Sequence, residues 1–315
     1  NIPSIVSYNG ATYNVASIAD YAFCNCESLT AINIPEGVTS IGEYAFEYCS
    51  NLTSITLPES VTEIGDYAFE DCSNLTAITL PESVTSIGSN AFYNTGWYNS
   101  QPDGVVYVGK FLYKYKGSMP SNSTIEVKEG TKGIADYAFQ YCSNLTSITL
   151  PESVTSIGSN AFYMCRSLTS ITIPFGITSV ESSAFSGCWS LTSISIPESV
   201  TSIGNRAFEY CNSLTSITIS DNSQMKSIGE KAFQYCNSLT SITLPESMTS
   251  IGDLAFYYCR SLASISIAKN SLLTSIGERA FSYCTSLTTI TIPARVASIG
   301  GDAFRDCNSL TFVTC

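Results

Sequence analysis

The stretch Leu52–Asn74, which reads LTSITLPESVTEIGDYAFEDCSN, decides the fold because close variants of it recur along almost the whole chain. Its most constant part is an Ala-Phe pair that appears twelve times between Ala22 and Ala303, and in eleven cases a Cys follows the Phe by three residues. The pairs are 23 residues apart, except for two steps of 25 and one of 47. Such a period is typical of solenoids, in which each repeat forms one coil and contacts only its neighbours. Long repeated surfaces favour a binding function over catalysis.

One coil can be followed residue by residue in the same stretch. Ile55 and Leu57 alternate with Ser54 and Thr56, which predicts a short strand with the apolar pair inside and the hydroxyl pair outside. The next residue, Pro58, cannot donate to a sheet ladder and ends the strand. Apolar residues at positions 61 and 64 then predict a return wall. The Ala-Phe-x-x-Cys segment is expected to form a short helical turn that places Phe and Cys in the core.

The complete pattern, L-x-x-I-x-I/L-P-x-x-V-T-x-I-G-x-x-A-F-x-x-C, resembles the BspA-type leucine-rich repeats of bacterial surface proteins, which also occur in some parasitic protists. The resemblance implies an α/β repeat solenoid, a leucine-rich repeat fold of about 12–13 coils of ~23 residues. A parallel β-sheet is expected on the concave face, with short strands and helical turns on the other walls. It also implies a secreted or surface-displayed adhesion protein, and the family has no generally recognised catalytic residues.

Departures from the repeat suggest the domain organisation. Residues 1–315 are predicted to form a single leucine-rich repeat domain, in which 1–20 form an N-terminal capping hairpin around Asn9-Gly10. Thr95 replaces the Cys of one repeat, and the pattern then dissolves. Residues 93–124 are therefore predicted to form an irregular coil with a β-hairpin insertion at 105–117. No signal-peptide pattern opens the chain and it stops in mid-repeat, so a mature or trimmed fragment is expected.

Composition narrows the function classes. The chain has no histidine, which removes the usual general base and the commonest transition-metal ligand. The net charge is −12, and residues 1–109 hold twelve acids and neither Lys nor Arg, so nucleic acid is not an expected partner. Either these acids keep a regular protein soluble, or a basic partner docks on them. The apolar runs are too short to span a bilayer, so no membrane insertion is expected.

The cysteines occupy one slot per coil from Cys26 to Cys307, which predicts a buried column of small apolar thiols. Disulfides along the column are conceivable because adjacent coils should lie about 5 Å apart, but pairing every member would strain the stack. We expect no disulfides, no metal site, no cofactor and no catalytic residue. Cys315 falls in the slot of Leu57 and is predicted to be another core position.

Stacking turns surface positions into stripes. One stripe consists of uncharged hydroxyls on the strand face, and its concave-face candidates for ligand binding are Ser54, Thr56, Ser147, Thr149, Ser170 and Thr172. These residues either form a low-affinity ligand face or simply tile a crowded sheet. A stripe of Glu after the turn prolines either holds Ca²⁺ or forms a solvated edge. A stripe of Tyr before the Cys either packs on the core or contacts partners.

The predicted hairpin region gathers aromatic and cationic residues, which is the composition of interface hot spots. The ligand-binding candidates here are Trp97, Tyr98, Tyr107, Lys110, Phe111, Tyr113, Lys114 and Tyr115. The competing interpretation is that the hairpin only covers the core of a degenerate coil.

The sequence therefore predicts a non-catalytic, extracellular or cell-surface adhesion protein that binds a protein or glycan on another cell or matrix. We expect it to act as a monomer or to associate weakly end to end. The alternative is a passive structural stalk or spacer within a larger surface protein. Ice binding and a glycosidase are weaker possibilities, because a curved, mixed Ser/Thr face suits ice poorly and no insertion pairs two carboxylates.

Overall fold

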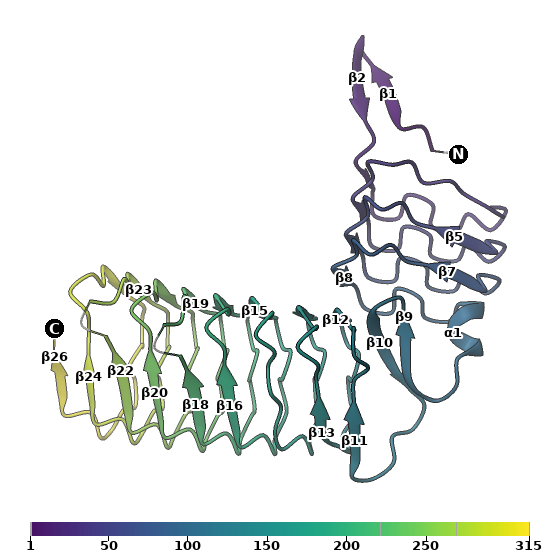
Figure 1. Cartoon of the computed structure of the whole chain (residues 1–315). Coiled ribbons are helices and arrows are strands. Elements are labelled where there is room, and N and C mark those ends of the chain that lie inside the picture. The colour runs from purple at the N-terminus through teal and green to yellow at the C-terminus, as the bar shows by residue number, and fades with distance from the viewer. Residues whose placement is uncertain (1, 221, 269, 315) are drawn as a thin grey trace. The chain divides into compact units, whose positions relative to one another are not determined.

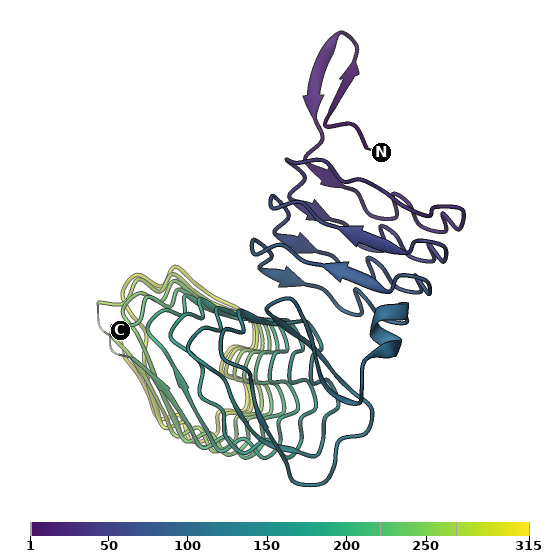
Figure 2. The same ribbon diagram turned by 45° about the vertical axis from the view of Figure 1, so that its right-hand side comes forward.

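The structure is a computed structural model that describes residues 2–220, 222–268 and 270–314. The chain forms two compact units: unit 1 comprises Asn1–Ser118 and Lys132–Ala138, and unit 2 comprises Met119–Thr131 and Phe139–Cys315. In each unit, short parallel strands of successive coils stack into sheets (Figures 1 and 2), which confirms the predicted repeat solenoid. The single domain over 1–315 stays a prediction, and Cys315 lies outside the described residues.

Unit 1 has two stacked walls of parallel strands. The return wall runs in the order β3 (Ser17–Ile18), β4 (Ser40–Ile41), β6 (Glu63–Ile64) and β8 (Ser86–Ile87). The first wall pairs β5 (Ser54–Thr56) with β7 (Ala77–Thr79). Identical positions of successive coils face each other, as with Ile55 and Ile78, because the 23-residue period keeps every coil in register.

Unit 2 repeats the arrangement over more coils. Its first wall contains β11 (Ser123–Glu126) paired with β13 (Leu145–Thr149), and then β16 (Ser193–Ile196), β18 (Ser216–Ile219), β20 (Ser241–Leu244), β22 (Ser264–Ile267), β24 (Thr289–Thr291) and β26 (Phe312–Thr314). Its return wall contains β14 (Ser156–Ile157), β15 (Ser179–Val180), β17 (Ser202–Ile203), β19 (Ser227–Ile228), β21 (Ser250–Ile251), β23 (Ser275–Ile276) and β25 (Ser298–Ile299).

The core of each unit is a set of ladders with one side chain from each coil. The Phe rings of neighbouring coils stack in parallel, for example Phe185 on Phe208 with 5.4 Å between ring centroids. The column cysteines from Cys49 to Cys284 are buried, as predicted, and the described cysteines form no disulfide with one another. Cys26 differs, since it is exposed in the first coil, and Cys307 is only partly buried. Burying each Phe contributes roughly 1.5–3 kcal/mol, so the Phe ladder is a main source of stability.

The Ala-Phe-x-x-Cys segments do not form the predicted helical turns. Among the described residues, α1 (Gly96–Ser100) is the only α-helix. In a regular coil, Tyr44 and Tyr48 take left-handed φ values of 55° and 58°, and residues in that conformation interrupt an α-helix. The N–H groups of Tyr44, Phe46 and Tyr48 donate to carbonyls of the next coil, whereas those of Glu47 and Cys49 donate three residues back. The segment therefore serves as a third wall that joins adjacent coils.

Asp66 and Asn205, which each lie two positions before the Ala of an Ala-Phe pair, also act between coils. The Oδ1 atom of Asp66 accepts the N–H of Ser89 in the next coil at 2.6 Å, and that of Asn205 accepts the N–H of Glu230 at 2.8 Å. As at a helix N-cap, a short side-chain oxygen satisfies an orphan backbone donor. The donor belongs to the neighbouring coil and not to a helix of the same coil.

Both predicted hairpins form in unit 1. β1 (Ile5–Tyr8) pairs antiparallel with β2 (Ala11–Asn14) through a turn in which Asn9 and Gly10 have positive φ values of 52° and 79°. All residues of these two strands are exposed, so the hairpin stands out from the first coil and does not cover it as a cap (Figure 1). The second hairpin joins β9 (Gly104–Val108) to β10 (Phe111–Lys116), and β10 also pairs with β12 (Gly133–Ile134).

Candidate functional site

The irregular region of unit 1 is built around one short helix that the repeat pattern did not reveal. Thr95 is the N-cap of α1, since its Oγ1 accepts the N–H of Tyr98 at 3.0 Å and donates to the carbonyl of Phe92 at 2.9 Å. A cysteine cannot fill this role well, because a thiol is a weak hydrogen-bond acceptor. The missing Cys at position 95 was the signal that could have predicted the helix.

The hairpin aromatics mostly fill the core of unit 1. Tyr98, Phe111 and Tyr113 are buried, and Trp97 and Tyr107 are partly buried. The Tyr113 hydroxyl accepts the N–H of Phe92 at 2.9 Å, and burial raises the pKa of Tyr113 well above its ordinary value. These positions support the interpretation that the hairpin covers a degenerate coil. The ligand-binding role of this region stays a prediction.

The hairpin lysines are held by the same unit. Lys110 forms an ion pair with Glu82, and Lys114 donates to Asn90. The Lys116 ammonium donates to the carbonyls of Tyr98, Asn99 and Gln101 at 3.1, 3.0 and 2.6 Å, which satisfies the carbonyl end of α1. Tyr115 is half-buried and donates its N–H to Ala138. The partners of Lys116 are backbone carbonyls, which no sequence motif marks.

The predicted hydroxyl stripe lies on the first wall. Ser54 and Thr56 are exposed in unit 1, and Thr149, Ser170 and Thr172 are exposed in unit 2, where Ser147 is half-buried. These six side chains form no hydrogen bond with any described residue. In unit 2, a shallow depression of about 370 Å³ is lined by Ser147, Thr149, Ser170, Thr172, Ser193, Ser195 and the Ile residues between them. The stripe therefore offers free hydroxyls on a wide open surface.

A second set of threonines is built into the fold instead. Each begins the first wall of a coil, and its hydroxyl donates to the carbonyl of the equivalent threonine one coil earlier. Thr169 donates to Thr146 at 3.1 Å and Thr215 to Thr192 at 3.0 Å. The sequence pattern alone did not separate these structural hydroxyls from those that face solvent.

The thiols lack the surroundings of a nucleophile. The Sγ atoms of Cys49, Cys72 and the column cysteines from Cys165 to Cys307 donate to the Phe carbonyl of the preceding coil, for example Cys72 to Phe46 at 3.0 Å and Cys259 to Phe233 at 3.1 Å. Burial raises the pKa of Cys165, Cys188 and Cys236 well above the ordinary value, so these groups remain protonated. Cys, Asp and Glu side chains of the described residues nowhere gather in a group of three or more suited to a metal ion.

The predicted glutamate and tyrosine stripes are both at the surface. Glu36, Glu59, Glu82, Glu152, Glu198 and Glu246 are all exposed, as a solvated edge requires. Tyr48, Tyr141 and Tyr210 are exposed, whereas Tyr235, Tyr258 and Tyr283 are half-buried in a stack along the coils. In the described parts of the chain, no helix combines the length and apolar character needed to cross a bilayer.

The fold and these surfaces can be compared with known proteins. A family model described as the BspA type leucine rich repeat region matches residues 7–101, 106–225 and 213–315 in six copies. A leucine rich cell surface protein from Faecalibacterium prausnitzii is 32% identical, with 95% of this chain and 86% of that chain covered and a TM-score of 0.38. A leucine-rich repeat protein from Bacteroides ovatus is 25% identical, over 99% of this chain and 85% of that one, with a TM-score of 0.38.

A third solved structure, the leucine rich repeat protein of T. pallidum, is 30% identical over 56% of this chain and 82% of its own, with a TM-score of 0.50. No curated protein matches the chain. The family model nevertheless spans nearly every residue of the repeat array, and the observed coils supply the strand register and core slots that its repeat demands. The chain therefore belongs to the BspA-type leucine-rich repeat proteins.

Proposed function

We propose that this protein is a non-catalytic recognition module, secreted or displayed at the cell surface, that binds a protein or glycan carried by another cell or by the extracellular matrix. One observation carries the proposal: the exposed hydroxyls of Thr149, Ser170 and Thr172 line a shallow depression on the first wall of unit 2, and no described residue forms a hydrogen bond with them. Such a surface suits an extended partner better than a small substrate, because small-molecule sites are concave and mostly apolar. The surface character of the Faecalibacterium relative supports the location.

The residue inventory favours binding over catalysis. The chain has no histidine, and the buried thiols with raised pKa values are poor nucleophiles. The proposed ligand-facing residues are Ser147, Thr149, Ser170 and Thr172, with Ser54 and Thr56 on the corresponding wall of unit 1. Of the hairpin residues, Tyr107 and Lys110 retain enough exposure to contribute.

The test is capture of partners by the intact chain from extracellular-matrix proteins and cell-surface extracts at physiological salt. Thr172→Lys places a long charged side chain in the middle of the exposed wall and should reduce capture by at least about tenfold if a partner desolvates that residue. Thr178→Lys is the matched control, because Thr178 is also exposed but precedes β15 on the return wall. Equal capture by both variants would contradict the proposed face.

A passive spacer is the second candidate, and the burial of the hairpin aromatics favours it. If the irregular coil only closes the core of unit 1, this unit contains no binding hot spot. Its main contribution is then the length of its stack of coils. Deleting the hairpin would remove Tyr113 and expose Phe92 at the end of the Phe ladder, so point variants are the better test. Absence of capture from every extract, with Tyr107→Ala and Lys110→Ala also without effect, is the result a spacer predicts.

A further inference from the structure

One edge of unit 2 combines exposed aromatic rings with two arginines that form no ion pair with a carboxylate of the described residues. This cysteine edge consists of the residue before and the residue after each column cysteine from Cys165 to Cys259. The Arg166 guanidinium lies over the ring of Trp189 at 4.4 Å, and that of Arg260 lies over the ring of Tyr258 at 5.0 Å. Both arginines are exposed, and Trp189 is 41% exposed.

The charge on this edge is positive and unbalanced. None of the ten residues of the cysteine edge is Asp or Glu, and neither Arg166 nor Arg260 forms an ion pair with a described residue. The nearby Glu209 is mostly buried and is paired with Arg206 at 4.0 Å. An arginine that stacks on a ring keeps its N–H donors directed outward and free for an anion.

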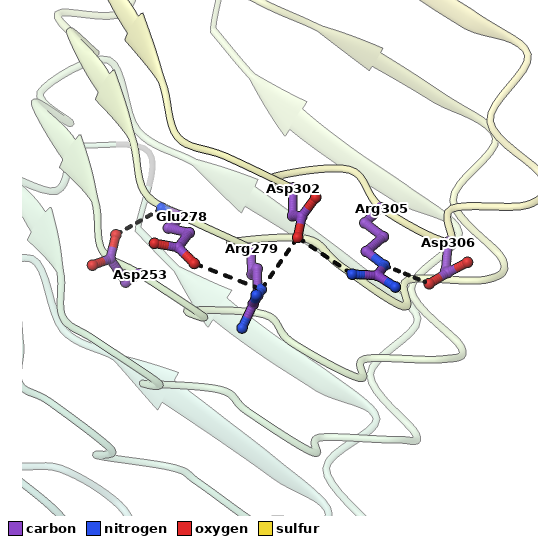
Figure 3. A network of polar contacts seen from close by, with 6 residues as sticks. All are labelled: Asp253, Glu278, Arg279, Asp302, Arg305 and Asp306. Atoms are coloured by element: carbon purple, nitrogen blue, oxygen red, sulfur yellow. Dashed lines mark hydrogen bonds and ion pairs between the residues drawn. The ribbon is translucent and has the colours of Figure 1, made fainter.

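Other arginines of unit 2 show the contrast. Arg279 lies 3.4 Å from Asp302 and 3.6 Å from Glu278, and Arg305 lies 3.4 Å from Asp302 and 3.3 Å from Asp306 (Figure 3). Those guanidiniums are neutralised within the protein. Arg166, Arg260 and Arg295 form no ion pair with a described residue, and of these three Arg166 and Arg260 are held over aromatic rings.

The backbone arranges the edge before any ligand arrives. Tyr210, Tyr235 and Tyr258 precede their cysteines in the left-handed conformation, with φ values of 60°, 61° and 61°. Repetition of one unusual backbone conformation holds the rings in a row, with Tyr210 and Tyr235 stacked at 4.8 Å and 8°. Arg166 and Arg260 are four coils apart, which corresponds to about 19 Å at the usual strand spacing. The edge is therefore a preorganised linear array, which lowers the entropy cost of binding.

We propose that the cysteine edge is a second binding surface, which takes an anionic polysaccharide, and this inference goes beyond the recognition function proposed for the first wall. Arg166 and Arg260 contact carboxylate or sulfate groups, and Trp189 and the tyrosine row contact sugar rings. Charge complementarity selects an anion, and the depressions found among the described residues are lined by residues outside this edge. A linear surface with a constant repeat matches a linear polymer with a constant repeat, and the free aromatic edges match the mixed polar and C–H surface of a sugar.

The experiment measures binding of the full chain to polygalacturonate, dextran sulfate, neutral dextran and poly-L-glutamate, at low and at physiological salt. The proposal expects binding to polygalacturonate or dextran sulfate, none to neutral dextran, and affinity that falls as salt rises. The comparison of the two anionic polymers distinguishes carboxylate from sulfate recognition. The Arg166→Gln/Arg260→Gln variant should lose at least about tenfold in affinity and most of the salt dependence. Trp189→Ala should reduce the affinity for the same polymer severalfold.

Arg295→Gln is the matched control, since Arg295 is exposed at a turn outside this edge and should change affinity less than twofold. Unchanged thermal unfolding shows that each variant is folded. Tighter binding to poly-L-glutamate than to either polysaccharide, or an unaffected double arginine variant, would overturn the proposal. If the double variant still captures partners from surface extracts while losing the polysaccharide, the recognition function does not depend on this edge. If the parent captures extract partners but binds neither anionic polymer, only the cysteine edge proposal fails.

Discussion

At the scale of single residues, the structure explains why the Phe and Cys slots are so constant. The Phe ring fills the core, and its carbonyl receives both the Cys N–H of its own coil and the Cys Sγ of the next, as Phe46 does with Cys49 and Cys72. Cysteine suits this position because it is small, apolar and still a weak donor. The column is therefore structural, and its chemistry is limited to one hydrogen bond per coil.

Glu70 of unit 1 gives a pH-dependent prediction. Burial, together with the charges of Asp71 and Glu47, raises the pKa of Glu70 to about 7, although Lys114 opposes the shift. Between the unfolded pKa near 4.5 and the folded value near 7, the folded protein binds more protons than the unfolded chain, so stability falls as pH rises through this range.

Glu70→Gln should therefore stabilise the protein at pH 8 by on the order of 1 kcal/mol, a value discounted because the carboxyl is half-exposed and screened. The gain should vanish near pH 4, where both forms are neutral. Urea unfolding from pH 4 to pH 8 measures it, with the exposed Glu59→Gln as control. Identical pH profiles for Glu70→Gln and the parent would show that Glu70 titrates normally.

At the scale of elements, α1 shows how one position can leave the repeat. Thr95 occupies the slot of a column cysteine, is fully buried and starts the helix, whose carbonyl end is satisfied by Lys116. Tyr113 then supplies the ring that closes the core beside Phe92, at 5.6 Å between ring centroids. A helix, a strand and a lysine together replace one regular coil.

Restoring the repeat at this position should therefore harm the protein. Thr95→Cys, and the isosteric Thr95→Val, remove the acceptor for the Tyr98 N–H and should each cost about 1–2 kcal/mol in chemical unfolding. Thr192→Val is the control, because the Thr192 hydroxyl is exposed and its bond to Thr169 is 3.4 Å long, so its cost should stay below about 0.5 kcal/mol. A Thr95→Cys variant at least as stable as the parent would mean that the cap contributes nothing.

At the scale of the whole molecule, stability should be local, because each coil contacts mainly its two neighbours. Phe208 stacks between Phe185 and Phe233, at 5.4 and 5.3 Å. Phe208→Ala should cost about 3–5 kcal/mol, since it opens a cavity in the ladder. Hydrogen exchange should accelerate most in the coils of Phe185 and Phe233 and least in that of Phe281.

The exposed Ser193→Ala in β16 of the same coil is the control and should leave exchange unchanged. Equal acceleration through every coil of unit 2 would instead indicate that the unit unfolds as one cooperative body.

The period of the repeat was enough to predict the solenoid, the parallel register and the core ladders. A side chain that recurs once per coil must stack on the equivalent side chain of the next coil, and alternation along a strand determines which side chains face inward. Both hairpins could also be predicted, because Asn9-Gly10 and Gly109-Lys110 carry local turn signals between alternating runs. These features depend on local chemistry and on repetition, and both can be read from the amino-acid sequence.

Tertiary structure decided the remainder. The third wall is not helical, because hydrogen bonds to the next coil compensate for left-handed residues such as Tyr44 that no local propensity favours. The aromatic residues of the second hairpin are mostly buried, since they must close the core that a degenerate coil leaves open. The cysteine edge exists only after stacking, because Arg166 and Trp189 are 23 positions apart in the sequence and meet across two coils. The sequence alone determined which positions recur in every coil, and contacts between coils decided which of these positions lie at the surface.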